Sequence, residues 1–187
     1  MNWPEKGIRL TQQTTFPEEQ GTTLIVSAAK PVDVDLKLRI PYWAKSGSVK
    51  VNGRPIPAFA DPSSYLVLRG PWKNGDRIEL NLPMQLHAAP MPDRQSLQAA
   101  MYGPLVLAAR FEDVPKENWY RHYQAQTKQE PAPPLQFKGK VDDASSWIEP
   151  AAGKLAFRAV SEGQNVAFVP LSSVLHERYF VYHEVRS

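Results

Sequence analysis

The stretch VDVDLKLRIPYWAKSGSVKVNG, residues 32–53, decides the fold of this chain. Its first nine residues alternate apolar and charged side chains, a period of two that is typical of a strand with one buried face. Pro31 and Pro41 flank this strand, as expected of residues that cannot donate a hydrogen bond inside a ladder. The stretch closes on Asn52-Gly53, a strong hairpin signal because both residues tolerate positive φ. It therefore predicts antiparallel strands joined by tight turns.

Outward from this stretch, the chain repeats the pattern of short apolar segments separated by turn residues. No segment shows the period of an amphipathic helix. The 18 prolines among 187 residues agree with this, because proline is excluded from helix interiors and central strands. We therefore predict an all-β fold, an antiparallel β-sandwich or jelly roll with a second, smaller β domain. Further strands are predicted at residues 22–27, 48–51, 65–69, 78–84, 97–102, 104–109, 155–160, 166–169 and 179–185.

The character of the sequence changes after residue 111. Residues 112–147 are polar and carry several prolines without a sustained period. A structureless loop of that length is unusual inside a compact domain, so this segment favours the start of a second domain. We predict a β-sandwich over residues 1–110 and a smaller β domain over residues 111–177, with a long proline-bearing loop.

Charge and residue usage exclude several classes of function. The formal net charge is only +3, and basic residues are interleaved with acidic ones, so there is no basic stripe for nucleic acid. The chain has no cysteine, which excludes disulfides, a thiolate nucleophile and cysteine-ligated zinc. No apolar run approaches the roughly 20 residues of a membrane span. The opening MNWPEKGIRL lacks the features of a signal peptide, so we expect any export signal upstream; a periplasmic or secreted parent protein is compatible with these properties.

Four blocks of the sequence together resemble one enzyme family. The blocks are GIRLTQQTTFP (7–17), RIPYWAKSGSVKVNG (39–53), YLVLRGPWKNGDRIELNLPM with MYGPLVLA (65–84 and 101–108) and PLSSVLHERYFVYHEV (170–185). They resemble the region that follows the catalytic barrel in glycoside hydrolase family 127, the β-L-arabinofuranosidase-like enzymes. The resemblance covers most of the chain except residues 112–150.

The resemblance implies an (α/α) barrel followed by two β-sandwich regions, with the last strand returning to the first sandwich. In this chain the strand at residues 178–187 would then complete the sandwich of residues 1–110. The chemistry implied for the family is retaining hydrolysis by a zinc-bound cysteine with a glutamate acid/base, all on the barrel. This chain has neither barrel nor cysteine, so none of those catalytic residues carries over to it.

The polar residues themselves do not form a catalytic or metal-binding pattern. Asp33, Asp35 and Glu79 occupy outward positions of half-buried strands, where ordinary solvated carboxylates are expected. Asp142 and Asp143 fit the start of a turn. The four histidines lack the HxH or HxxxH spacing of a local metal site. They could bind a metal ion only if the fold brought them together from distant parts of the sequence. We predict no catalytic residue, no metal ligand and no cofactor.

Aromatic side chains are the remaining candidates for binding, since an aromatic ring offers a large apolar face to a sugar. For Trp43 and Trp72, at strand ends in the blocks above, packing into the core is the favoured interpretation. The cluster around Trp119 fits equally well a binding edge, a contact to a barrel or simple loop packing. The candidate carbohydrate-contacting residues are Trp119, Tyr120, Tyr123 and Trp147.

We therefore predict a non-catalytic accessory β module of a family 127-like glycoside hydrolase, with no enzymatic activity of its own. Its expected partner is the catalytic α/α barrel of a parent chain, and the surface that faces the barrel should be more apolar than the rest. Such a surface would also support a homodimer. Two alternatives stay open: an independent carbohydrate-binding module, and a protein-interaction or assembly domain.

Overall fold

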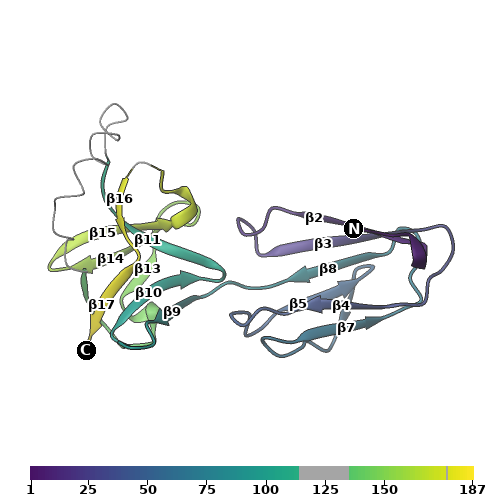
Figure 1. Ribbon diagram of the computed structural model, residues 1–187, viewed down its shortest axis with the longest axis horizontal. Helices are drawn as coiled ribbons and strands as arrows, with labels where there is room; N and C mark the ends of the chain where they lie inside the picture. The colour runs from purple at the N-terminus through teal and green to yellow at the C-terminus, as the bar shows by residue number, and fades with distance from the viewer. Residues whose placement is uncertain (114–134, 176) are drawn as a thin grey trace. The chain divides into compact units, whose positions relative to one another are not determined.

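Strands dominate both parts of the chain in the computed structural model, which describes residues 1–113, 135–175 and 177–187 (Figure 1). The chain divides into a first unit, Met1–Met84, and a second unit, Gln85–Ser187. Helical structure in the described ranges is limited to short 3-10 turns, which confirms the all-β prediction. Within the same ranges no helix is long and apolar enough to cross a membrane.

The first unit contains two antiparallel sheets. The larger one has the strand order β1-β2-β3-β8-β5-β6, and the smaller one pairs β4 with β7. The strands are β1 (Asn2–Trp3), β2 (Ile8–Thr14), β3 (Gly21–Ala28), β4 (Asp35–Arg39), β5 (Ser48–Val51), β6 (Arg54–Ile56), β7 (Tyr65–Arg69) and β8 (Arg77–Asn81), and the 3-10 turn η1 spans Pro4–Lys6.

The alternating segment 32–40 contains β4, which pairs with β7. Leu36 of β4 lies opposite Leu68 of β7, and Leu38 lies opposite Leu66; all four are buried, while the residues between them face solvent. Burying one leucine side chain stabilises a fold by about 1.5–3 kcal/mol, so these four dominate the local energetics. The strand is shorter than the alternation suggested, because Val32 forms only an isolated bridge.

The buried faces of the two sheets together form the core of a β-sandwich. The larger sheet contributes Val26, Val49 and Ile78, each at most 1% exposed. The predicted hairpin at Asn52-Gly53 is present, with φ of 52° and 76°. Both values lie in the left-handed region, which explains why this turn needs asparagine and glycine.

The second unit is built on one continuous, mixed sheet. Its order is β12-β17-β10-β11-β15-β14-β13, with β9 also paired to β10 and β16 to β11. β12 runs parallel to β17, and the other pairings are antiparallel. The elements are β9 (Leu86–Pro90), β10 (Leu97–Tyr102), β11 (Leu105–Asp113), β12 (Gln136–Lys138), η4 (Ala144–Ser146), β13 (Ile148–Pro150), β14 (Phe157–Ser161), β15 (Gln164–Pro170), η5 (Leu171–Ser173), β16 (Glu177–Phe180) and β17 (Tyr182–Arg186).

This sheet curls so that its first strand, β12, meets β14, the last strand but one. Ser161 of β14 donates a hydrogen bond of 2.7 Å to the carbonyl oxygen of Gln136 in β12, although the two strands stand far apart in the sheet order. The enclosed core is aromatic. Phe137, Trp147 and Phe168 pack around one another, with ring centroids 4.9–6.1 Å apart.

The boundary between the units differs from the sequence-based prediction. We predicted a division near residue 110, whereas the structure divides after Met84. Residues 85–110 form β9, β10 and the start of β11, which pair with β15, β16 and β17. The final strand β17 does pair with β10, so it returns to the region before residue 110, but that region belongs to the second unit. Turn-separated strands continue evenly across residue 84, so the sequence shows no break there.

Candidate functional site

The predicted carbohydrate-contacting residues fall into two groups. Trp119, Tyr120 and Tyr123 lie outside the described residues. Trp147 follows η4 and is only 7% exposed, stacked on Phe137 at 4.9 Å with an interplanar angle of 22°. Its ring therefore packs in the core of the second unit, and little of its surface is open to a ligand.

A surface groove opens beside Trp147. It has a volume of about 910 Å³ and is lined from β12, η4, β13, β14 and the end of β17. We call it the β12–β14 groove and define it by Lys138, Trp147, Ile148, Glu149, Arg158 and Val160. Trp147 and Ile148 are buried and form its apolar floor, whereas the other four are exposed.

A close approach of the backbone fixes the position of Trp147. A Cβ atom added to Gly139 would stand 2.7 Å from Ser146 Oγ and 2.9 Å from Trp147 Cβ. Ser146 Oγ also accepts a hydrogen bond of 2.7 Å from the backbone N–H of Lys140. Only glycine allows the chain to pass this close, so the loop that carries the groove floor is tightly held.

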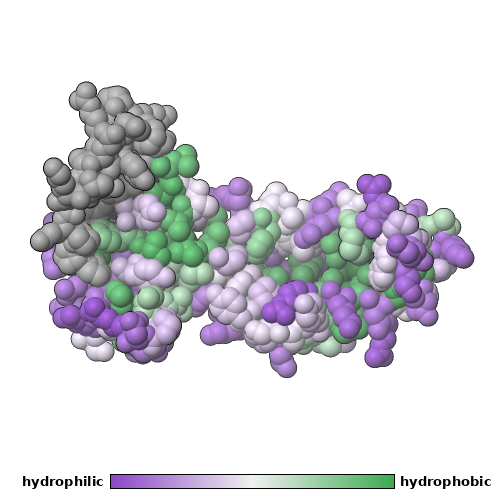
Figure 2. All heavy atoms as spheres, viewed as in Figure 1, coloured by the Kyte–Doolittle hydropathy of each residue, from purple (hydrophilic) through white to green (hydrophobic). Residues whose placement is uncertain are grey.

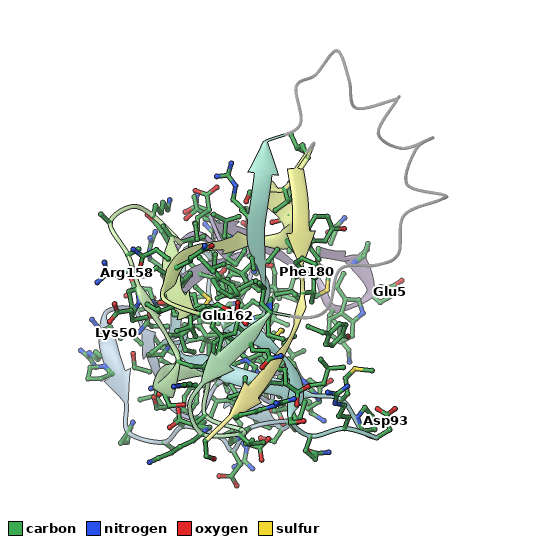
Figure 3. The ribbon with its side chains drawn as sticks, turned by 90° about the vertical axis from the view of Figure 1, so that its left-hand side faces the viewer. Glu5, Lys50, Asp93, Arg158, Glu162 and Phe180 are labelled. Atoms are coloured by element: carbon green, nitrogen blue, oxygen red, sulfur yellow. The ribbon has the colours of Figure 1, made fainter. Side chains whose placement is uncertain are left out.

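The rim of the groove carries mixed charge. Glu149 and Arg158 are directly opposed across β13 and β14, and Arg158 Nε donates to Glu149 Oε1 at 2.8 Å. Both side chains are exposed, so this pair is a surface ion pair of small energetic weight. Arg158 extends outward from the second unit (Figure 3). Lys138, Arg186 and Glu162 also line the groove, so three cations face two carboxylates.

Inside the second unit lies a set of buried polar groups. Gln98 and His183 face each other across β10 and β17, and both are fully buried. Within the described part of the chain, neither side chain has a hydrogen-bond partner, and the same holds for the indole nitrogen of Trp147. Burial lowers the pKa of His183 from 6.5 to about 4, because the cationic ring would lose its hydration there.

Glu184, the neighbour of His183, is a buried carboxylate with hydrogen-bonding and charged partners. A hydrogen bond from Ser96 is the largest influence on its carboxyl group, and the charges of Arg94 and Arg186 add to it. Together they hold the pKa of Glu184 below its usual range despite burial. Arg94 Nη2 lies 2.5 Å from Glu184 Oε2 and Arg186 Nε lies 3.6 Å from Glu184 Oε1. This carboxylate is therefore a structural ion-pair centre.

The other carboxylates considered in the sequence lie at the surface or in a turn. Asp33 and Asp35 are exposed, and Glu79, on β8 in the other sheet from β4, pairs with Arg77 at 3.3 Å. Asp143 accepts a hydrogen bond from Ser145 in the turn before η4. Across the described ranges no group of three or more His, Cys, Asp or Glu is placed to hold a metal ion.

The two tryptophans that were expected to pack are buried. Trp43 is 8% exposed and stacks on Phe16, and Trp72 is 3% exposed. The indole nitrogen of Trp72 donates to the carbonyl oxygen of Val34 at 2.9 Å. The packing interpretation is therefore confirmed for both.

Sequence reasoning missed the charged residues of the groove. The pair Glu149–Arg158 carried one usable signal, since opposite charges flank the turn at residues 151–156 in a hairpin. Lys138 and Arg186 carried none, because the parallel pairing of β12 and β17 joins segments that are far apart in sequence.

These features define a class of protein: a β module with a sandwich unit, a curled-sheet unit and an amphiphilic surface groove. Residues 1–84 match the family model described as Beta-L-arabinofuranosidase, GH127 middle domain. These are the bounds of the first unit, so the predicted resemblance to the GH127 family is confirmed for that unit.

Similar solved structures extend the likeness to the whole fold. A glycoside hydrolase matches with a TM-score of 0.69 and 19% identity over 100% of this chain and 34% of its own. A GH127 β-L-arabinofuranosidase from Geobacillus stearothermophilus T6 matches with a TM-score of 0.63 and 18% identity, over 96% of this chain and 31% of its own. A GH127 β-arabinofuranosidase matches with a TM-score of 0.64 and 16% identity, over 96% of this chain and 32% of its own. At these identities the likeness shows the fold alone, and the chain spans about a third of the length of each structure. No curated protein sequence gives a significant match.

Proposed function

We propose that this chain is a non-catalytic accessory region of a GH127-like glycoside hydrolase whose catalytic barrel lies elsewhere in the parent protein. One observation carries the proposal: both units match the fold of such enzymes together, over 96–100% of this chain but only 31–34% of theirs. The middle-domain match over residues 1–84 gives the family of the first unit.

The polar chemistry of the described residues supports a role without catalysis. Glycoside hydrolysis generally needs two carboxyl groups about 5–10 Å apart across the sugar, one of them with a raised pKa. The buried carboxylate Glu184 has a lowered pKa and pairs with arginines. Glu149, at the groove, is an exposed partner of Arg158. Neither has the environment of a general acid.

The role we propose is to cover and position part of the barrel. Exposed apolar side chains support such a contact, because water-facing apolar groups in quantity mark interaction surfaces. In the first unit Tyr42, Tyr65 and Val67 are 59%, 53% and 41% exposed. In the second unit Figure 2 shows a hydrophobic area over the segment between β15 and β16, and Leu175 in that segment is 80% exposed.

The test compares the complete gene product with a version that lacks residues 1–187. We expect the complete protein to hydrolyse a nitrophenyl β-L-arabinofuranoside and to unfold at a higher temperature than the deletion variant. The 187-residue chain alone should give no hydrolysis above the buffer rate. The proposal is wrong if the isolated chain hydrolyses the substrate. It is equally wrong if deletion leaves both the activity and the unfolding temperature of the barrel unchanged.

The isolated chain gives a second test of the apolar contact surface. If those side chains normally meet a barrel, the free chain should self-associate through them, and light scattering should report a concentration-dependent mass. Leu175→Ser and Tyr65→Ser should each reduce that association. Val67→Thr, a smaller change on the same face as Tyr65, should have less effect. A chain that stays monomeric at all concentrations would contradict this part of the proposal.

A further inference from the structure

The β12–β14 groove combines an apolar floor with hydrogen-bonding groups of both kinds on its rim. β14 alternates, so Arg158 and Val160 share its outer face, and Glu149 lies directly opposite Arg158 on β13. Val160 is 57% exposed and places an aliphatic side chain on the rim of the groove. Lys138, on the outer face of β12, supplies a further donor.

The ion pair on the rim is arranged for hydroxyl groups. Arg158 uses Nε for Glu149 Oε1, which leaves the two terminal nitrogens of the guanidinium as donors. Glu149 keeps a second carboxylate oxygen as an acceptor. A hydroxyl both donates and accepts, so neighbouring hydroxyls on one sugar ring can engage both members of the pair. The apolar face of the same ring would lie against Val160 and the small exposed part of Trp147.

The charge balance of the groove argues against an anionic ligand. Lys138, Arg158 and Arg186 are offset by Glu149 and Glu162, and Arg186 is also engaged by Glu184. A phosphate or polyuronate site would present a clear excess of cations. The volume of about 910 Å³ lies at the upper end of the roughly 300–1,000 Å³ found for small-ligand sites.

From these observations we propose that the β12–β14 groove binds a segment of neutral oligosaccharide, separately from any hydrolysis. The site would hold a glycan chain on the module while a barrel acts elsewhere on it. The binding itself does not depend on the parent being an arabinofuranosidase; only the choice of the first probe rests on the proposed function. Failure of one proposal is therefore distinguishable from failure of the other.

The experiment is a titration of the 187-residue chain, followed by amide NMR signals and by calorimetry. The probes are an L-arabinose oligosaccharide, xylotetraose and cellotetraose as neutral glycans, and trigalacturonate as the anionic comparison. We expect at least one neutral probe to bind and to shift the signals of β12, β13 and β14. Trigalacturonate should bind more weakly than that probe.

Two exposed side chains provide the variants, which should leave the fold intact. Arg158→Ala removes the donor of the ion pair and should weaken binding about tenfold, equal to about 1.4 kcal/mol. Val160→Ser should weaken it without altering charge. The matched control is Arg77→Ala, which breaks a similar exposed pair with Glu79 in the first unit and should leave the affinity unchanged.

Three results would overturn the proposal. The first is that no neutral probe binds at millimolar concentration. The second is that Arg158→Ala and Arg77→Ala bind the neutral probe equally well. The third is a preference for trigalacturonate over every neutral probe, because the ligand class would then be wrong.

Discussion

His183 should make the second unit lose stability as the pH falls below neutrality. The ring is fully buried among Phe137, Trp147 and Phe168, and its pKa is lowered from 6.5 to about 4. In the unfolded chain the ring takes up a proton near its ordinary pKa, whereas in the folded chain it stays neutral until about pH 4. Falling pH therefore favours the unfolded state.

The size of the effect follows from the gap between the two pKa values. At about 1.4 kcal/mol for each pH unit, the interval from 6.5 to about 4 corresponds to about 3 kcal/mol. This contribution to the free energy of unfolding is complete above pH 6.5 and is lost progressively down to pH 4. Below pH 4 the group binds one proton in both states, so its effect becomes constant.

The assay is urea unfolding at several pH values between 7.5 and 4, followed by the amide NMR signals of β10 and β17. His183→Phe keeps an aromatic ring but cannot titrate. The difference in unfolding free energy between the two proteins isolates His183, because the titration of Glu184 is common to both. We expect that difference to change by about 3 kcal/mol in favour of the variant between pH 7 and pH 4.

Gln98→Leu serves as the control for this experiment. It removes a fully buried amide that has no hydrogen-bond partner among the described residues, and it introduces no titratable group. It should stabilise the second unit by about 1–3 kcal/mol, equally at every pH. If His183→Phe also gives a pH-independent change, the burial argument for His183 is refuted.

Two turn positions give further predictions. Asn52→Ala should destabilise the first unit by about 2–3 kcal/mol in urea unfolding. It forces alanine into φ of 52° and removes the side-chain hydrogen bonds to Asp76 and to the backbone of Arg77 in β8. Asn52→Gly relieves the strain in φ but not the lost hydrogen bonds, so it should recover about 1 kcal/mol. Gly139→Ala should lower the free energy of unfolding by about 1–3 kcal/mol and shift the fluorescence of Trp147, because the added methyl would overlap the Trp147 Cβ. The control is Gly21→Ala, where the nearest atom is 3.7 Å away and neither property should change. Equal effects of the two variants would contradict the steric argument.

The parts of the fold that could be predicted are those written in local patterns. Alternation in β4 and the Asn52-Gly53 turn were readable because each depends on neighbours in sequence. The burial of Trp43 and Trp72 could be anticipated from their places at strand ends.

What could not be predicted depends on pairings between distant segments. The unit boundary at Met84 is set by where β10 and β11 find partners, in β15, β16 and β17. The groove likewise joins Lys138, Arg158 and Arg186 from three strands whose order in the sheet no local pattern reveals. Trp147 looked like a loop residue in the sequence, and only the curl of the sheet encloses it.

The pairing of β10 with β17 has a consequence for how the chain emerges from the ribosome. The first unit has every strand it needs once residue 84 has been made, so it can fold while synthesis continues. In the second unit β10 can pair early with β9 and β11, but its partner β17, residues 182–186, is made about 80 positions later. We expect its half-made strands to be the part of the nascent chain that chaperones protect.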